Sequence, residues 1–288
     1  QSDTNHAFAM FYHFNLNGGN VFDTAYIYNN GKSDYYLGKW IETRNIRDEI
    51  VVLAKGAHTP DCHPKKIRPQ LEETLNRMGT TSVDIYCLHR DNTDIPVGDF
   101  IDTLNELKNE GLIGVFGASN WSLHRFKEAN EYALANDKEP FTVLSNNFSL
   151  ARMNSPVWPG CFSCSNNDYV DYIKENQIAV FPWSSQARGF FLDGQEFTGA
   201  AHVADPNREE QDRVWGSEEN FERRRRGLEL AEKKSVDPIQ IALAYVLCQQ
   251  FPTFPLIGPR NFFETENSMD ALNLALDSKE VAWLNLES

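Results

Sequence analysis

The sequence predicts an α/β protein in which parallel strands alternate with helices and close into a (β/α)8 TIM barrel. Two observations lead to this fold class. Short apolar runs with β-branched and aromatic character alternate along the chain with helix-forming segments. Several of these apolar runs also end in polar side chains that a buried strand does not need. Because a parallel barrel collects the carboxyl ends of its strands at one face, we expect the chemistry of the protein there.

The polar ends of four strands supply the first candidate residues. The stretch Asn20–Tyr28 begins as a strand and carries Asp23 and Tyr28 at its end. Three later strands end in the same manner, and their terminal residues are Lys55 after Ile50–Ala54, His89 after Val83–Leu88, and Ser119 with Asn120 after Ile113–Ala118.

The order of the predicted elements supports parallel βαβ units. Three further strands are expected, at Phe141–Asn146, Ile178–Trp183 and Phe254–Ile257. The helices are expected at Ala7–Asn17, Ser33–Thr43, Pro64–Met78, Phe100–Glu110, Leu123–Ala135, Asp168–Asn176, Ile239–Gln250 and Phe263–Ala271. Seven strands are one fewer than a barrel needs, so the missing first strand is expected before Ala7.

Composition bounds the class of protein. The 288 residues contain 41% hydrophobic residues, which suits one large core, and we expect a single domain over residues 1–288. The net charge of −14 disfavours nucleic acid and anionic membrane as partners. No apolar run reaches the roughly 20 residues of a membrane span, and no secretory signal opens the chain. A soluble, cytoplasmic protein is expected, with its oligomeric state left open.

The five cysteines do not describe a disulfide framework in a chain of this length. Cys161 and Cys164 form a CxxC pair in a loop, but no second pair completes a zinc site. We expect reduced loop cysteines, with a redox pair or a disulfide as the alternative.

Six sequence words, taken in order, resemble the aldo-keto reductase family, including its bacterial and fungal members. The words cover nearly the whole chain, and they are DTAYIY with GKSDYYLGKW, LAKG, DIYCLHRD, GVFGASNW, FPWSSQARGFF and PLIGPRN. Family members usually carry an N-terminal hairpin and a first strand, which this sequence lacks before Ala7. The resemblance implies a barrel enzyme that uses NADPH or NADH, without a metal, to reduce an aldehyde or a ketone.

The resemblance also assigns catalytic roles. Tyr28 is the acid that protonates the carbonyl oxygen, and Lys55 is the partner that lowers its pKa. Asp23 holds Lys55 charged and oriented, and His89 places the substrate carbonyl. A single Tyr near an Asp is more often structural, so the assignment depends on the family words.

Cofactor contacts follow from the same resemblance. Ser119 and Asn120 match the pair that binds the nicotinamide carboxamide, and Trp183 matches the ring that stacks on the nicotinamide. The phosphate-side loops are expected to use Ser184, Gln186 and Arg188 in one segment and Gly258, Arg260, Asn261, Glu264, Asn267 and Ser268 in the other. No GxGxxG motif points to a Rossmann mode.

Two departures from the family pattern affect the cofactor. Ser145 stands where family members commonly have Gln, which removes one contact to the carboxamide. Glu264 stands where a second Arg often grips the 2′-phosphate and would repel that group, although Arg260 can still bind it. NADPH is therefore slightly favoured, and NADH stays open.

The substrate pocket is expected in long loops, with aromatic candidates at Trp121, Trp158, Phe190 and Phe191. These suit an aryl carbonyl or a sugar-like ring, and Gly194–Gly216 is expected to form a mobile lid or a surface excursion. Two alternatives are kept. One is a redox-sensing or regulatory protein of the same fold, and the other is a metal-dependent hydrolase that uses His58, His63 and His89.

Overall fold

The computed structural model describes residues 2–192 and 208–287, and the chain divides into two compact units, Gln1–Ser145 and Asn146–Ser288. Each unit is considered by itself, and the single domain stays a prediction. Most of the predicted lid Gly194–Gly216 lies outside the described residues. None of the described helices is long and apolar enough to span a membrane.

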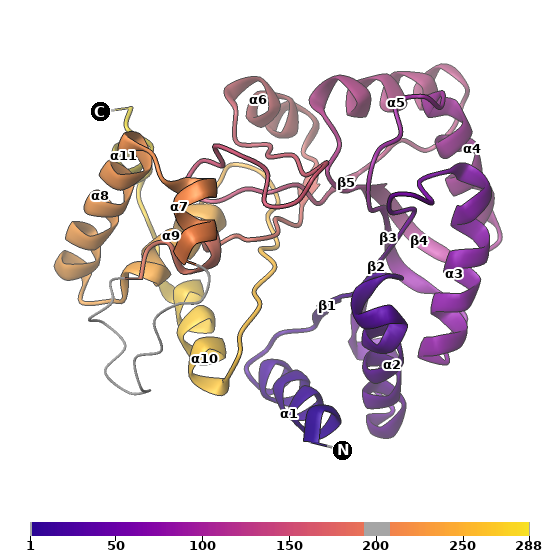
Figure 1. Cartoon of the computed structure of the whole chain (residues 1–288), viewed down its shortest axis with the longest axis horizontal. Coiled ribbons are helices and arrows are strands. Elements are labelled where there is room, and N and C mark those ends of the chain that lie inside the picture. The colour runs from indigo at the N-terminus through magenta and orange to yellow at the C-terminus, as the bar shows by residue number, and fades with distance from the viewer. Residues whose placement is uncertain (1, 193–207, 288) are drawn as a thin grey trace. The chain divides into compact units, whose positions relative to one another are not determined.

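The first unit is a parallel sheet whose strands pair in chain order (Figure 1). Its strands are β1 (Val21–Asp23), β2 (Val51–Gly56), β3 (Val83–Leu88), β4 (Ile113–Ala118) and β5 (Val143–Leu144). The register places Asp23 opposite Leu53, Lys55 opposite Cys87, and Leu88 opposite Ala118. The carboxyl ends of these strands therefore meet at one edge, as the sequence predicts.

Helices follow the strands in alternation. They are α1 (Ser2–Leu16), α2 (Lys32–Arg44), α3 (Pro64–Met78), α4 (Val97–Asn109) and α5 (Leu123–Ala135), with short 3-10 turns η1 (Tyr28–Gly31) and η2 (Arg47–Glu49). Figure 1 shows α2 to α5 packed in chain order along the outer side of the strands. The predicted bounds of α3 are confirmed, because Pro64 starts the helix and Gly79 ends it with a φ of 68°.

The core of the first unit contains a group of rings that meet edge to face. Trp121 lies 5.8 Å from Phe100 and 5.2 Å from Phe141 between ring centroids, and all three side chains are fully buried. Phe141 also contacts Phe116 and Phe126. Edge-to-face packing adds to the stability that burial of such large side chains provides.

Among its described residues, the second unit has one short strand, β6 (Ala179–Val180). Its helical elements are α6 (Asn167–Asn176), η3 (Ala187–Gly189), α7 (Arg208–Trp215), α8 (Glu218–Lys234), α9 (Pro238–Leu247), α10 (Phe262–Asp270), η4 (Ala271–Asn273) and α11 (Ser278–Leu284). α7 and α11 were not predicted, whereas Arg223–Arg226, which the sequence predicts as a solvated helix face, lies in α8. α8 is rich in charged residues and lacks a clear apolar period. Ion pairs between residues four apart, such as Arg225 with Glu229, stabilise it.

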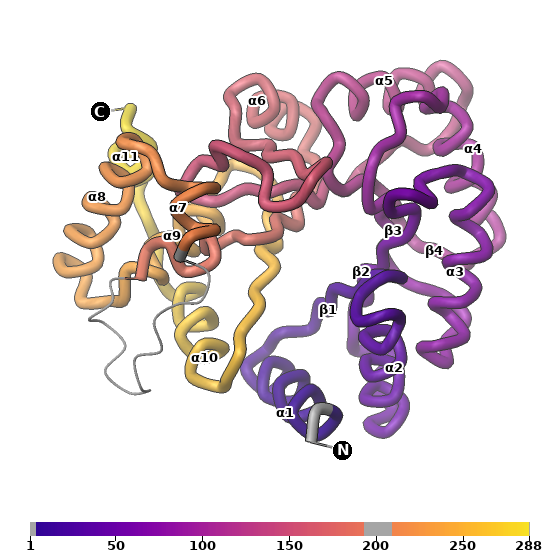
Figure 2. The backbone as a smooth tube through the Cα atoms, viewed as in Figure 1, coloured from indigo at the N-terminus to yellow at the C-terminus, as the bar shows by residue number. Residues whose placement is uncertain are grey.

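The prediction of a strand at Phe254–Ile257 is wrong, although this segment does hydrogen-bond alongside β6. Phe254 and Leu256 donate backbone hydrogen bonds to the carbonyls of Val180 and Pro182, at 2.8 and 3.0 Å. Pro182 has no N–H to donate back to the carbonyl of Phe254, so a continuous ladder does not form. Figure 2 shows the segment as a long path that leads into α10.

Candidate functional site

A buried ion pair joins the ends of β1 and β2. The Lys55 side chain is 3% exposed, and its ammonium donates a hydrogen bond to Oδ1 of Asp23. The backbone holds both strand ends, since Thr24 donates to the carbonyl of Leu53 and Tyr26 donates to the carbonyl of Lys55, each at 2.8 Å. The structure therefore brings Asp23 and Lys55 together as the sequence predicts.

Tyr28 lies against the same pair. It starts the η1 turn, and its backbone N–H donates to the carbonyl of Ala25 at 2.9 Å. Nζ of Lys55 lies 5.1 Å from the centroid of the Tyr28 ring. The chain then turns away through Asn29 and Asn30, which both adopt the left-handed conformation that Asn tolerates.

His89 completes the cluster from the end of β3. Its ring lies 5.5 Å from the Tyr28 ring at an interplanar angle of 83°. Its backbone N–H donates to Gly56 at 2.7 Å, and its carbonyl accepts from Nη1 of Arg90 and Nδ2 of Asn120. Nδ1 of His89 is buried without a hydrogen-bond partner among the described residues. The backbone of His89 is thus fixed, while one ring nitrogen is left for another group.

Burial and charge set the protonation states of this cluster. Burial alone would lower the pKa of Lys55, but Asp23 and Tyr28 outweigh it and raise that pKa to about 12. Burial raises the pKa of Tyr28 above 10, and the charge of Lys55 opposes that rise without reversing it. Burial lowers the pKa of His89 well below 6.5, and the charge of Lys55 adds to this. At neutral pH, Lys55 is charged, Tyr28 is protonated and His89 is neutral.

These states correct one expectation. Lys55 acts on the pKa of Tyr28 in the predicted direction, but the net pKa of Tyr28 is raised rather than lowered. The physical reason is that burial penalises the phenolate by more than one nearby ammonium stabilises it. Tyr28 is therefore held as a proton donor rather than poised as an anion.

Asp34 anchors the segment that carries Tyr28, a role that the sequence did not reveal. The fully buried carboxylate accepts hydrogen bonds from Thr24 at 2.6 Å and from Thr74 at 3.0 Å. Arg77, whose guanidinium also approaches Asp34, donates to the backbone carbonyl of Tyr26 at 2.9 Å. A carboxylate in the first turn of a helix usually faces solvent, so the sequence alone gave no signal for this burial.

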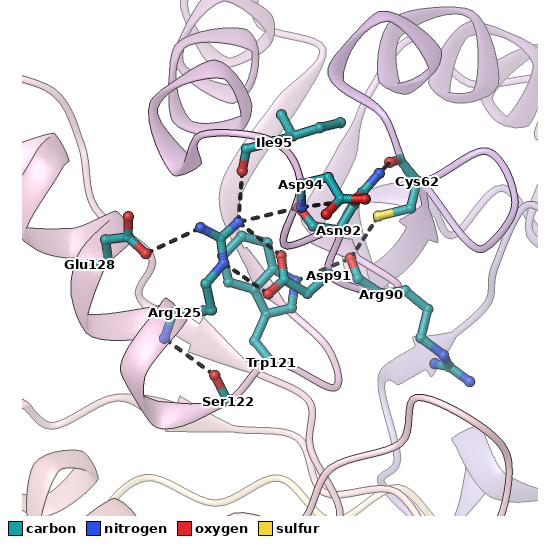
Figure 3. A network of polar contacts seen from close by, with 10 residues as sticks. All are labelled: Cys62, Arg90, Asp91, Asn92, Asp94, Ile95, Trp121, Ser122, Arg125 and Glu128. Atoms are coloured by element: carbon teal, nitrogen blue, oxygen red, sulfur yellow. Dashed lines mark hydrogen bonds and ion pairs between the residues drawn. The ribbon is translucent and has the colours of Figure 1, made fainter.

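A second network holds the loop that follows His89 (Figure 3). Arg125 makes two hydrogen bonds to the Asp91 carboxylate, at 2.9 and 3.1 Å, and donates to the carbonyl of Ile95 at 3.0 Å. The Cys62 thiol donates to the carbonyl of Arg90 at 3.1 Å, and so does the Trp121 indole. This loop is therefore tied to residues of two neighbouring loops and of α5.

Ser119, Asn120 and Ser145 are close together and buried. Oγ of Ser119 donates to the backbone carbonyl of Ser145 at 2.7 Å, and Nδ2 of Asn120 lies 3.0 Å from Oγ of Ser119. Asn120 has a φ of 61°. The structure brings the predicted carboxamide-binding residues together, and the side chains of Ser119 and Asn120 make hydrogen bonds within the first unit.

In the second unit, the structure joins the two predicted cofactor loops. Nε2 of Gln186 donates to Oγ of Ser268 at 3.3 Å. Trp183 is half-buried, and its indole N–H has no hydrogen-bond partner among the described residues. Arg188 pairs with Glu210 at 2.7 Å, and Ser184 and Arg188 both adopt positive φ.

Glu264 organises the segment from Gly258 to Ser268, which contains the start of α10. Its carboxylate pairs with Arg260 at 2.8 Å and accepts the backbone N–H of Arg260 at 2.7 Å. Asn261 caps α10 by accepting the N–H of Glu264. Asn267 donates to Asp237, and a side chain added at Gly258 would meet open space. Arg260 and Glu264 thus contact each other directly.

The four predicted substrate residues divide into two groups. Trp121 and Phe191 are fully buried and Phe190 is 6% exposed, so these three side chains have core positions in the structure. Trp158 is 51% exposed, and its ring lies 6.2 Å from the Trp183 ring. Only Trp158 presents a large aromatic surface to solvent, and sequence position alone could not separate these cases.

The described residues give little support to the predicted metal-dependent and cysteine-based alternatives. Nδ1 of His63 accepts the N–H of Lys65 and caps α3, and within the described chain no group of three or more His, Cys, Asp or Glu side chains could hold a metal ion. Cys161 and Cys164 are both buried, and neither forms a disulfide.

The chain is similar to known proteins over nearly its whole length. The model of the aldo/keto reductase family matches residues 1–285. Norsolorinic acid reductase A of Aspergillus parasiticus is 25% identical over 96% of this chain and 69% of its own length. An aryl-alcohol dehydrogenase of Pestalotiopsis microspora is 26% identical over 92% of this chain and 67% of its own length.

Solved structures agree in fold. An aldo-keto reductase from Klebsiella pneumoniae in complex with NADPH matches with a TM-score of 0.71 and 19% identity, over 99% of this chain and 86% of that one. An aldose reductase from Schistosoma japonicum matches with a TM-score of 0.70 and 18% identity, over 98% and 84%. The barrel fold class predicted from the sequence is confirmed by these matches.

Proposed function

We propose that this chain, which belongs to the aldo/keto reductase family, reduces an aldehyde or ketone to an alcohol with Tyr28 as the proton donor. Membership of the family makes it an NAD(P)-dependent oxidoreductase that acts on small carbonyl compounds. The observation that carries the role of Tyr28 is its contact with two groups at once. Nζ of Lys55 lies 5.1 Å from the Tyr28 ring centroid, and the His89 ring lies 5.5 Å from it.

Each residue of the cluster then has a chemical task. A bound nicotinamide supplies the hydride in this chemistry. Tyr28 keeps its proton at neutral pH and donates it as the carbonyl oxygen gains negative charge. Lys55, which Asp23 holds in place, stabilises the tyrosinate that this donation leaves behind. His89 is neutral and orients the carbonyl through a ring nitrogen.

The residues of the second unit fit a nicotinamide dinucleotide. Trp183 offers an aromatic face, and the two cations of the joined loops, Arg188 and Arg260, suit phosphate groups. We propose NADPH as the preferred cofactor, because Arg260 is 67% exposed and can turn from Glu264 to a 2′-phosphate. The similar Klebsiella reductase was solved with NADPH, which supports this choice.

We propose an aryl carbonyl as the substrate class. The exposed ring of Trp158 lies close to that of Trp183, and flat rings pack well on such a surface. Two similar proteins are named for norsolorinic acid and for aryl alcohols, and both names fit this class.

The replacement Tyr28→Phe tests the proposal. Loss of a general acid is expected to lower kcat by about 10²–10⁴-fold while the Kd for NADPH changes little. Tyr26→Phe is the matched control, because Tyr26 lies on the same segment but donates its hydroxyl to Glu73. Benzaldehyde reduction and NADPH fluorescence titration measure the two quantities. Normal turnover by Tyr28→Phe would remove Tyr28 from the acid role.

A further inference from the structure

We propose that His58 is a specificity-determining residue of this reductase, and that its Nε2 accepts a hydrogen bond from a hydroxyl group of the carbonyl substrate. The inference rests on the proposed function and adds a substrate feature to it. Neither the catalytic cluster nor the cofactor loops use His58.

The backbone before His58 is held in an unusual conformation. Ala57 has a φ of 55°, which lies in the left-handed region that residues other than Gly rarely adopt. The Ala57 side chain is fully buried, and its N–H donates to Oε1 of Gln70 at 2.7 Å. Gly56, one residue earlier, accepts the N–H of His89. The turn is therefore fixed by contacts on both sides, and it determines where the His58 ring lies.

This turn brings the His58 ring against the ring of His89. The two ring centroids are 4.8 Å apart at an interplanar angle of 81°. The other side chain in ring contact with His89 is Tyr28, at 5.5 Å. His58 is only partly buried, whereas His89 is 6% exposed. A substrate carbonyl that reaches Tyr28 and His89 would thus have the His58 ring within reach of its neighbouring atoms.

The hydrogen bond of His58 determines its tautomer. Nδ1 lies 2.8 Å from the backbone carbonyl of Thr59, and a carbonyl oxygen can only accept. Nδ1 therefore carries the proton. Burial lowers the pKa of His58 below 6.5, and the charge of Arg90 adds to this, so the ring is neutral at neutral pH. Nε2 is then a bare acceptor, and the described residues provide no hydrogen-bond partner for it.

A bare imidazole nitrogen selects for one kind of group. It cannot bind another acceptor, such as a carboxylate or a second carbonyl, without gaining a proton that Arg90 disfavours. It can bind a neutral hydroxyl donor. Because His58 is adjacent to the residue that orients the carbonyl, the hydroxyl should lie near the carbonyl on the same molecule. Hydroxylated aryl carbonyls meet this description within the substrate class proposed above.

The test compares benzaldehyde with its ortho-, meta- and para-hydroxy derivatives. For the best hydroxy isomer, the wild-type kcat/KM should exceed that for benzaldehyde by roughly three- to tenfold, which is the effect of one neutral hydrogen bond. His58→Phe, which keeps a ring but has no acceptor, should bring this ratio to about one. His58→Gln should retain part of it, because its amide oxygen can take the place of Nε2. His63→Asn is the control, since His63 is exposed and can be replaced as a helix cap.

The same preference is measured at equilibrium, so that it does not depend on turnover. The Kd values of benzyl alcohol and its hydroxy derivatives for the protein with NADP+ should show the same ratio and the same loss in His58→Phe. If the wild type reduces none of the aldehydes, the proposed function fails, and these binding ratios still decide the role of His58. An unchanged ratio in His58→Phe, no preference in the wild type, or no binding of any alcohol would overturn the inference.

Discussion

In the first unit, Lys55 is 3% exposed and is ion-paired with Asp23, whereas in the second unit Arg260 is 67% exposed and is ion-paired with Glu264. Both pairs join a cation with a carboxylate in residues predicted to form the site. The ammonium of the first pair is buried, its carboxylate is 21% exposed, and the backbone of two strands holds both residues. The second lies on the surface, where an ion pair is worth at most about 1 kcal/mol.

The difference suggests two ways of preparing a site. The cluster of Asp23, Lys55, Tyr28 and His89 has fixed positions, which suits proton transfer, where small displacements are costly. The cations of the cofactor loops are instead paired with carboxylates of the same chain, as Arg188 is with Glu210. Phosphate groups can replace such partners at modest cost.

The largest effect on stability is expected from Lys55→Met. Removing one partner of a buried ion pair leaves Asp23 uncompensated, at a cost of about 3–5 kcal/mol in the free energy of unfolding. Turnover should be lost as well. Urea denaturation measures the change. The double variant with Asp23→Asn should recover much of the stability but none of the turnover. A loss in Lys55→Met of less than about 1 kcal/mol would show that the pair is not effectively buried.

Arg125→Met should have the next largest effect. Arg125 and Asp91 are 10% and 9% exposed, and their two hydrogen bonds hold the loop that begins at His89. Destabilisation by about 2–3 kcal/mol is expected. A fall in kcat with little change in the Kd for NADPH should accompany it, because the carbonyl-orienting residue loses its support. Glu128→Gln is the control, since Glu128 is 45% exposed and binds the same guanidinium. Equal effects of the two changes would argue against this role of the loop.

These two ion pairs also show which residues of the site could be predicted from the sequence. Asp23, Lys55 and His89 were predictable because each follows a strand-like run, and the structure brings them together. Asp34 and Arg125 were not, because their importance comes from burial against side chains more than 30 residues away, such as Thr74 and Asp91. Periodicity reports which face of a helix is apolar, and it does not report which charged residue is taken inward with its partner.

The same limit applies to the protonation of Tyr28 and to the aromatic residues. The sequence indicated that Lys55 stabilises the phenolate, but it could not show that burial has the larger effect on the pKa. Trp121 and Phe191 looked like pocket residues because they follow strand-end motifs, yet both are fully buried. The extent of burial depends on the packing of the whole fold, and a local motif does not contain that information.

Glu264→Gln should change cofactor preference by a smaller amount. Arg260 would lose its carboxylate partner and a like charge would no longer face the 2′-phosphate, so the affinity for NADPH relative to NADH should rise about two- to fivefold. Parallel fluorescence titrations with the two cofactors measure the ratio. Glu266→Gln is the matched control, because it makes the same charge change at an exposed position two residues away. A ratio that rises equally in both variants would point to net charge rather than to the pair.

A pH dependence of stability is also expected. The pKa of folded His89 lies well below 6.5, mainly because of burial, so below about pH 6.5 the unfolded chain binds a proton that the folded chain does not. Stability should therefore fall as the pH drops from about 6.5, by at most about 1.4 kcal/mol per pH unit from this group. His89→Asn should lose less stability than the wild type between about pH 7.5 and pH 5.5 in urea denaturation. Identical losses would mean that His89 titrates normally.

The central claim is that a protonated Tyr28 beside Lys55 delivers the proton to the carbonyl. Single-turnover reduction of benzaldehyde, followed by loss of NADPH absorbance in the preformed complexes of the wild type, Tyr28→Phe and Tyr26→Phe, tests it most directly. With all three proteins saturated by NADPH, the single-turnover rate should be lower by about 10²–10⁴-fold in Tyr28→Phe alone. A single-turnover rate in Tyr28→Phe equal to that of the wild type would contradict it.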